Sequence, residues 1–126
     1  MIRRYIDTPV HAPGMPFSDA VLAGDTLYLS GAIGWDYDAR GIPKNFSDEA
    51  RQVLKNIGVV LRTSGFDYGD VVKATAFITD FSLFSEWNDV YREFFTAPFP
   101  ARSTVGVATL ARGARLEVEM IAVRRK

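Results

Sequence analysis

The sequence Pro-Phe-Pro-Ala-Arg-Ser-Thr-Val-Gly-Val, residues 98–107, marks the boundary between a helix and a strand. Pro98 and Pro100 end the preceding helix, because proline lacks a backbone N–H and holds the residue before it in extended geometry. A strand pattern then begins at Ala101. Alternate strand residues point to the same face of a sheet, so one face of this strand carries three residues of interest: Arg102, Thr104 and Gly106.

Arg102 is the first candidate functional residue. A guanidinium can bind a carboxylate through two parallel N–H···O bonds, so arginine is well suited to holding a carboxylate ligand. Gly106 lies on the same face and leaves room for a small ligand or for another backbone. The alternative is that Arg102 forms a surface salt bridge, a common contact that contributes little to stability.

The last predicted strand, residues 115–123, carries the second candidate. One face of this strand is apolar, and the other face begins with Glu117 and Glu119 before it also turns apolar. A carboxylate on such a face is a candidate for a raised pKa and for proton transfer. Glu117 is therefore a candidate general acid or base.

We expect strands 101–109 and 115–124 to form a hairpin across residues 111–114. This pairing would place Arg102 and Glu117 on neighbouring strands. The sequence does not fix the register of the two strands, so the expectation is that the two residues are neighbours, not that they touch.

The remainder of the chain alternates between strand and helix patterns. Further strands are expected from their apolar alternation and flanking turn residues at 2–6, 20–23, 26–30 and 71–78. One helix is expected after an N-cap at Ser47, ending at Gly65. A second helix is expected after a cap at Asp80 or Ser82. This order predicts a single α+β domain over residues 1–126, with about six strands in a mixed sheet and two helices.

Asn88 lies on the inner stripe of the second predicted helix, between the aromatic residues Phe84 and Tyr91. A buried asparagine must find hydrogen-bond partners. Asn88 therefore either ties the helix to a neighbouring segment or lines a pocket.

Composition excludes several classes of function. Lys+Arg and Asp+Glu are 15 each, so the net charge is zero, and a general nucleic-acid binder is not expected. The chain has no cysteine, which removes disulfides and thiolate nucleophiles and fits a cytoplasmic location. The N-terminus lacks a signal-peptide pattern, and no stretch is apolar enough to span a membrane. With a single histidine, His11, no metal site is expected, and His11 is interpreted as a non-catalytic surface residue.

Several motifs together resemble the RidA (YjgF-like) family of enamine/imine deaminases. They occur in the family's order and at about its spacing, from about residue 14 to residue 125. The motifs are PFPARSTVGVATL followed by RLEVEMIAV, Leu29-Ser30-Gly31, the segment 70–78, and Asn88-x-x-Tyr91-x-x-Phe94-Phe95.

The resemblance implies a fold and an assembly. Two helices would cover one face of the sheet, and the chain would form a chorismate mutase-like homotrimer. A trimer would also account for the apolar surface of the strands, because a sheet with helices on one side leaves its other side bare.

The resemblance also implies a reaction. Arg102 would bind the carboxylate of a small 2-imino or 2-amino-unsaturated acid, and Glu117 would position or activate the attacking water, without a metal or cofactor. Ammonia and a 2-oxo acid would be released. The family's pocket lies between subunits, and further residues would complete it: Phe17, Ser30, Gly31, Asn88 and Thr104.

This sequence departs from the family pattern at four positions. Phe17 replaces a tyrosine, Thr104 a cysteine and Ala32 a glutamine, and Gly106 replaces a larger residue. A more apolar, roomier pocket favours a substrate larger than the three-carbon imine. The loss of the tyrosine hydroxyl at position 17 favours the alternative function, a ligand-binding or regulatory trimer with little or no turnover.

Overall fold

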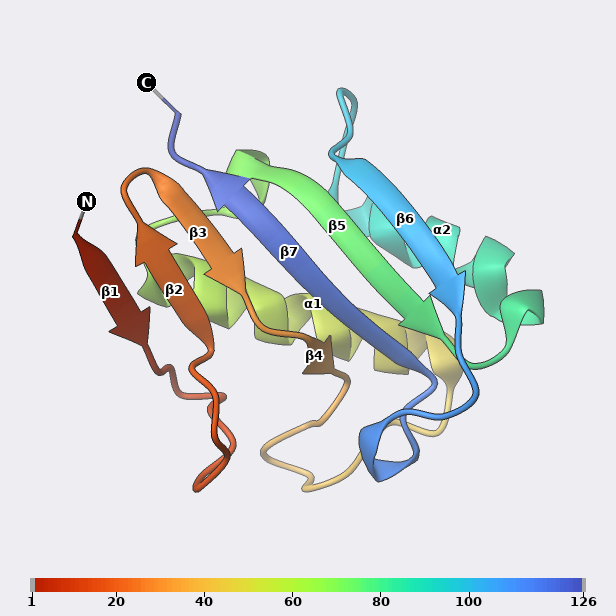
Figure 1. Ribbon diagram of the computed structural model, residues 1–126. Coiled ribbons are helices and arrows are strands. Elements are labelled where there is room, and N and C mark those ends of the chain that lie inside the picture. The colour runs from red at the N-terminus through yellow and green to blue at the C-terminus, as the bar shows by residue number, and fades with distance from the viewer. Residues whose placement is uncertain (1, 126) are drawn as a thin grey trace.

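The computed structural model describes residues 2–125 of the chain. Its centre is a seven-stranded mixed sheet with the order β1-β2-β3-β7-β5-β6, and the short strand β4 also pairs with β7. Both helices lie behind the sheet in Figure 1, so the other face of the sheet is open. The elements are β1 (Arg3–Ile6), β2 (Ala20–Ala23), β3 (Thr26–Leu29), β4 (Ala32–Ile33), α1 (Phe46–Thr63), β5 (Val71–Ile78), α2 (Phe84–Phe94), β6 (Ala101–Gly106) and β7 (Leu116–Val123).

This architecture confirms the predicted α+β fold with two helices on one face. The additional strand, β4, is only two residues long, so it shows no apolar alternation that a sequence could reveal. Three short 3₁₀ turns connect the larger elements: Tyr68–Asp70, Phe81–Leu83 and Ala111–Gly113.

The predicted hairpin between strands 101–109 and 115–124 is wrong. β5 lies between β6 and β7, pairing in parallel with β6 and antiparallel with β7. The physical reason is visible in Figure 1: α2 carries the chain from β5 to β6 across the covered face. Such a βαβ crossover makes β5 and β6 parallel neighbours.

The register of these strands places Arg102 and Glu117 on opposite faces of the sheet. Arg102 pairs with Ala74, which is fully buried beneath the helices. Glu117 pairs with Phe77 on the open face. Residues that pair across a ladder point to the same face, so Arg102 faces α2 and Glu117 faces away from it.

The end of α1 follows the expected chemistry, whereas the starts of both helices differ from the prediction. α1 begins two residues earlier than predicted, because the side chain of Asn45, not Ser47, caps it by accepting a hydrogen bond from the backbone N–H of Asp48. Gly65 follows α1 with φ +84°, a conformation that glycine adopts without strain. Neither of the two caps proposed for the second helix caps α2 itself, which follows Leu83 without a side-chain cap. Asp80 caps the preceding 3₁₀ turn, Phe81–Leu83, by accepting from the backbone N–H of Ser82.

A buried ion pair joins α1 to the start of β7. Glu49 is fully buried, and its two carboxylate oxygens accept hydrogen bonds from the backbone N–H and from Nε of Arg115, each at 2.7 Å. Gly34 packs directly against Glu49, and a Cβ at position 34 would lie 2.6 Å from the Glu49 carbonyl oxygen. Helix, strand and the β4 segment therefore meet at this carboxylate.

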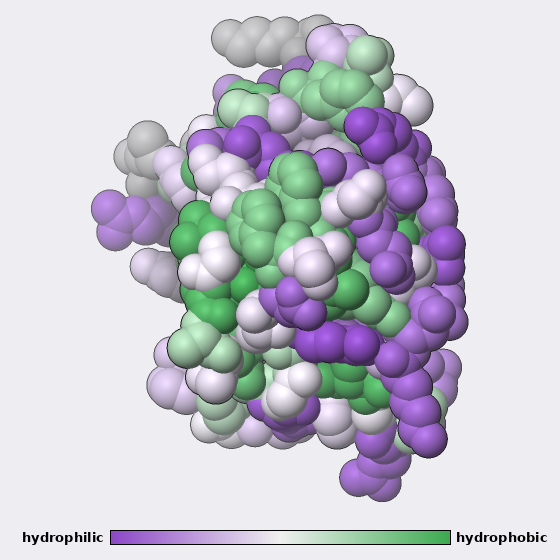
Figure 2. Space-filling model, turned by 90° about the vertical axis from the view of Figure 1, so that its right-hand side faces the viewer, coloured by the Kyte–Doolittle hydropathy of each residue, from purple (hydrophilic) through white to green (hydrophobic). Residues whose placement is uncertain are grey.

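The open face of the sheet carries apolar side chains without cover. Tyr5, Tyr28, Val105 and Val123 are each at least a third exposed. Figure 2 views the molecule from the side of β6 and α2, where hydrophobic residues gather toward the middle of the view and hydrophilic residues along its right-hand margin. Exposed apolar side chains that share one face of a sheet commonly mark an interaction site.

We expect Glu49→Ala to lower the free energy of unfolding by about 3 kcal/mol, because removal of one partner leaves a half-buried guanidinium without its counter-charge. Urea unfolding followed by circular dichroism measures this loss. Glu93→Ala is the matched control, since Glu93 pairs with Arg51 on the surface. Equal losses in the two variants would contradict the structural role assigned to Glu49.

Candidate functional site

Glu117 lies over the backbone of Gly31 on the open face. A Cβ added to Gly31 would collide with the Glu117 carboxylate, so this approach requires glycine at position 31. Burial raises the pKa of Glu117 above its usual value, and the charge of Glu119 raises it further. A carboxyl group of this kind can exchange a proton nearer neutral pH than an exposed glutamate can.

Glu117 and Gly31 line a cavity of about 570 Å³. Phe17 and Ser30, both named from the sequence, line the same cavity. The structure therefore brings together four of the seven sequence-predicted site residues. The cavity wall also contains residues that the sequence did not single out, among them Met15, Trp35, Tyr37, Asn56 and Arg112.

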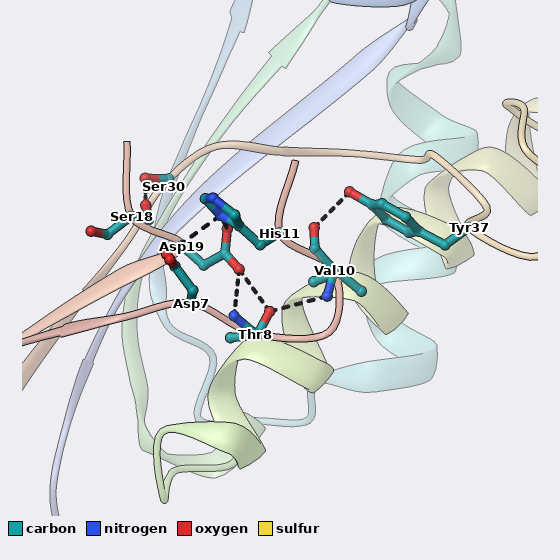
Figure 3. Close-up of polar contacts among 8 residues, drawn as sticks. All are labelled: Asp7, Thr8, Val10, His11, Ser18, Asp19, Ser30 and Tyr37. Atoms are coloured by element: carbon teal, nitrogen blue, oxygen red, sulfur yellow. Dashed lines mark hydrogen bonds and ion pairs between the residues drawn. The ribbon is translucent and has the colours of Figure 1, made fainter. Parts of the chain in front are cut away.

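The loop between β1 and β2 forms one wall of this cavity and is held by Asp19 (Figure 3). The buried Asp19 carboxylate accepts hydrogen bonds from the backbone N–H and from the hydroxyl of Thr8, at 2.9 and 2.7 Å. His11 Nδ1 lies 3.0 Å from the other Asp19 oxygen. Across the loop, the Tyr37 hydroxyl donates to the Val10 carbonyl oxygen at 2.6 Å.

His11 therefore holds the cavity wall in place. Its side chain is 21% exposed and contacts the edge of the Phe17 ring, with the ring centroids 6.1 Å apart. The hydrogen bond to Asp19 raises the pKa of His11 above its usual value. No local sequence pattern pairs residues 11 and 19, so this contact could not be predicted from the sequence.

Ser30 contributes to the wall through its position, not through a free hydroxyl. Its Oγ donates to the Ser18 carbonyl oxygen at 2.6 Å, as Figure 3 shows. Its backbone N–H donates to the carbonyl oxygen of Asp19 at 2.9 Å. Ser30 thus ties the end of β3 to the loop that carries Phe17.

Arg102 and Asn88 lie elsewhere, in a smaller pocket of about 260 Å³ between α2 and β6. The Arg102 guanidinium donates a hydrogen bond to Asn88 Oδ1 and lies over the Tyr91 ring, 4.7 Å from its centroid. Burial lowers the pKa of Arg102 from its usual value. The guanidinium is thus oriented by neutral groups alone, and its remaining N–H groups stay available to a carboxylate.

Thr104 lies on the same face as Arg102 and lines neither pocket. Its hydroxyl is buried without a hydrogen-bond partner within residues 2–125, as are Trp87 Nε1 and the Tyr91 hydroxyl. One chain therefore carries two separated groups of candidate residues. The first surrounds Glu117 on the open face, and the second surrounds Arg102 beneath the sheet edge.

One set of side chains among the described residues has the composition of a metal site. Asp7, His11 and Asp19 place their ligand atoms within 4.8 Å of one another. The three side chains already contact each other or Thr8, and these contacts account for their arrangement. The structure therefore assigns them to holding the loop.

Comparisons with known proteins identify relatives of this chain in sequence and in fold. The model of the endoribonuclease L-PSP family matches residues 9–124. A 2-iminobutanoate/2-iminopropanoate deaminase of Dermatophagoides farinae is 46% identical, over 96% of this chain and 96% of that protein. A protein of the same name from Capra hircus is 44% identical, over 98% of this chain and 92% of that protein. The crystal structure of E. coli TdcF with bound serine is similar with a TM-score of 0.84 and 38% identity, over 88% of this chain and 90% of that chain.

We expect Gly31→Ala to lower the pKa of Glu117 toward that of an exposed glutamate, because the added methyl group pushes the carboxylate into water. Carboxyl-carbon NMR titration measures this shift. Gly41→Ala is the control, since a Cβ at position 41 meets no atom within 4 Å. An unchanged Glu117 pKa in Gly31→Ala would show that the carboxylate does not depend on this approach.

The His11–Asp19 contact predicts a pH-dependent stability. Because the folded-state pKa of His11 is raised, its contribution is complete below about pH 6.5, the unfolded value, and is lost as pH rises through the folded pKa. The stability difference between wild type and His11→Gln should therefore shrink as pH rises. Urea unfolding at several pH values measures it, and a difference that grows with pH would refute the ion pair.

Proposed function

The chain belongs to the endoribonuclease L-PSP family, in which its relatives are RidA-like proteins, and from this premise we propose that it hydrolyses small 2-imino acids to 2-oxo acids and ammonia. The observation that carries the proposal is the Glu117 carboxylate, which lies over Gly31 in a cavity and has a raised pKa. The names of the curated relatives support an imine substrate.

The proposed reaction needs a held carboxylate, a water molecule and a proton carrier. A guanidinium binds the substrate carboxylate and orients the imine carbon, which lowers the entropic part of the barrier. Glu117 accepts a proton from water as the water oxygen attacks the imine carbon. The same carboxyl group gives this proton to the imine nitrogen, which completes a carbinolamine. It then carries the proton of the new hydroxyl group to the amine nitrogen, so the carbon–nitrogen bond breaks, the carbonyl forms and ammonia leaves. General acid–base catalysis of this kind contributes roughly 10²–10⁴-fold.

We propose that the guanidinium comes from Arg102 of a neighbouring copy. In one chain Arg102 and Glu117 lie on opposite faces of the sheet with β5 between their strands, so one chain does not present both to one substrate. The exposed apolar side chains of the open sheet face support a close assembly of copies, and a homotrimer is the assembly expected from the sequence. Asn88 would orient the guanidinium, and Thr104 would lie behind it on the same strand.

No helix among the described residues is long and apolar enough to cross a membrane. The cytoplasmic location and the organisation of residues 1–126 as one RidA-like domain stay predictions. The alternative function, a ligand-binding or regulatory trimer, also stays a prediction. It is favoured by Phe17, which faces the cavity without the hydroxyl of a tyrosine. Binding of 2-oxo acids without imine turnover would support that alternative.

Subunit mixing tests the proposed reaction and the shared site together. An amino-acid oxidase generates 2-iminopropanoate, and semicarbazide traps the imine that the protein leaves. We expect Arg102→Ala and Glu117→Gln each to lose at least about 100-fold in rate. When the two variants are mixed and refolded as one population, sites with both residues intact should recover about a quarter of the wild-type rate, because closed symmetric assemblies pair copies at random.

The outcomes of this experiment are distinct. Recovery of activity in the mixture supports a site built from two copies. A mixture that stays inactive, although sedimentation shows an assembly, would place both residues in one site within a chain. A wild-type protein that lowers trapping of no imine would refute the deaminase proposal.

A further inference from the structure

Within one chain the cavity around Glu117 has a volume of about 570 Å³, in the range of pockets that enclose drug-sized ligands, and Arg102 of a neighbouring copy would occupy part of it. The part of the cavity beyond Glu117 is formed by the loop after β4 and by the turn between β6 and β7, which contribute Trp35 and Arg112. The chemistry of that end determines which side chain a longer substrate can carry.

Among residues 2–125, Arg112 is the one cationic side chain that lines the cavity. Its guanidinium lies over the Trp35 ring, 4.1 Å from the ring centroid. Within residues 2–125 it has no carboxylate at ion-pair distance. Stacking on an aromatic face fixes the orientation of a guanidinium and leaves the N–H groups at its edge available to an anion.

Arg112 and the Glu117 carboxylate line different parts of one cavity. The Glu117 carboxylate lies over Gly31, before β4, whereas Arg112 lies over the ring of Trp35, after β4. A substrate whose imine carbon is near Glu117 would therefore reach Arg112 with a terminal carboxylate on its side chain.

The carboxylates that line the cavity do not cancel the attraction of Arg112 for an anionic group. Asp19 is engaged by Thr8 and His11. Glu119 is exposed, so its charge is screened by solvent. Directional hydrogen bonds from an oriented guanidinium are stronger than this screened repulsion.

We propose that Arg112, oriented by Trp35, binds a second carboxylate, so that the protein accepts 2-imino dicarboxylic acids in addition to the monocarboxylic imines. The inference rests on the proposed function for the reaction itself. It differs in naming a distal anion subsite and in assigning substrate specificity to a residue outside the Arg102 and Glu117 groups.

Two stable product acids of equal carbon number test the subsite directly. 2-Oxoglutarate and 2-oxopentanoate differ only in a terminal carboxylate against a methyl group. We expect calorimetry to show that the wild type binds 2-oxoglutarate at least about ten-fold more tightly than 2-oxopentanoate, since a hydrogen bond between charged groups has an effect of this size. Arg112→Gln should bring the ratio of the two dissociation constants close to one. Arg112→Lys should give an intermediate ratio, because lysine keeps the positive charge but lacks the paired N–H groups of a guanidinium.

Arg40→Gln is the matched control. Arg40 is an exposed arginine with φ 60°, close to the φ 57° of Arg112, and it does not line the cavity. Its substitution should leave the ratio unchanged. A wild-type ratio near one, including the case in which neither acid binds, would overturn the inference, as would an Arg112→Gln ratio equal to that of the wild type.

Turnover separates this inference from the proposed function. The imines of glutamate and of norvaline, generated by the matching oxidases, are compared with 2-iminopropanoate. Hydrolysis of 2-iminopropanoate without a preference for the glutamate imine over the norvaline imine would refute the distal subsite alone. Tight 2-oxoglutarate binding that depends on Arg112, without hydrolysis of any imine, would support the subsite and refute the deaminase proposal.

Discussion

The buried contact between Glu49 and Arg115 fixes the position of β7, and β7 positions much of the sheet. A fully buried carboxylate is stable only if its charge is compensated, so the start of β7 must stay at the N-terminal turn of α1. β3, β4 and β5 all pair with β7. The location of Glu117, two residues after Arg115, therefore follows from a structural ion pair and not from any contact of its own.

β5 determines what one chain can do chemically. Its insertion between β6 and β7 separates two groups that the reaction requires together, one beneath α2 and one on the open face. The edge strand β6 and the uncovered apolar face are also the surfaces that another copy can reach. An assembly of copies would thus cover apolar surface and complete the site through the same contacts, which links the stability of the assembly to its activity.

Local patterns in the sequence predicted much of this structure. The prolines before residue 101, the glycine at residue 65 and the apolar alternation around Glu117 all act over a few residues, so the sequence displays them. The insertion of β5, the two-residue strand β4 and the cap at Asn45 depend on which segments meet in the folded chain. The His11–Asp19 contact and the Arg112–Trp35 stack are of the same kind, and no periodicity reveals them. Of the expected site residues, the cavity contains Phe17, Ser30, Gly31 and Glu117, whereas Arg102, Asn88 and Thr104 lie elsewhere.

The carboxylates of the cavity differ because their surroundings differ. Asp19 is more deeply buried than Glu117, yet it accepts hydrogen bonds from Thr8 and contacts His11, so its charge is compensated and its role is structural. Glu117 has no hydrogen-bond donor within residues 2–125 and lies near another carboxylate, Glu119. Burial without compensation raises a carboxyl pKa, whereas hydrogen bonds to the ionised form oppose this effect. Two acidic groups in one cavity can therefore act differently, one holding the wall and the other carrying a proton.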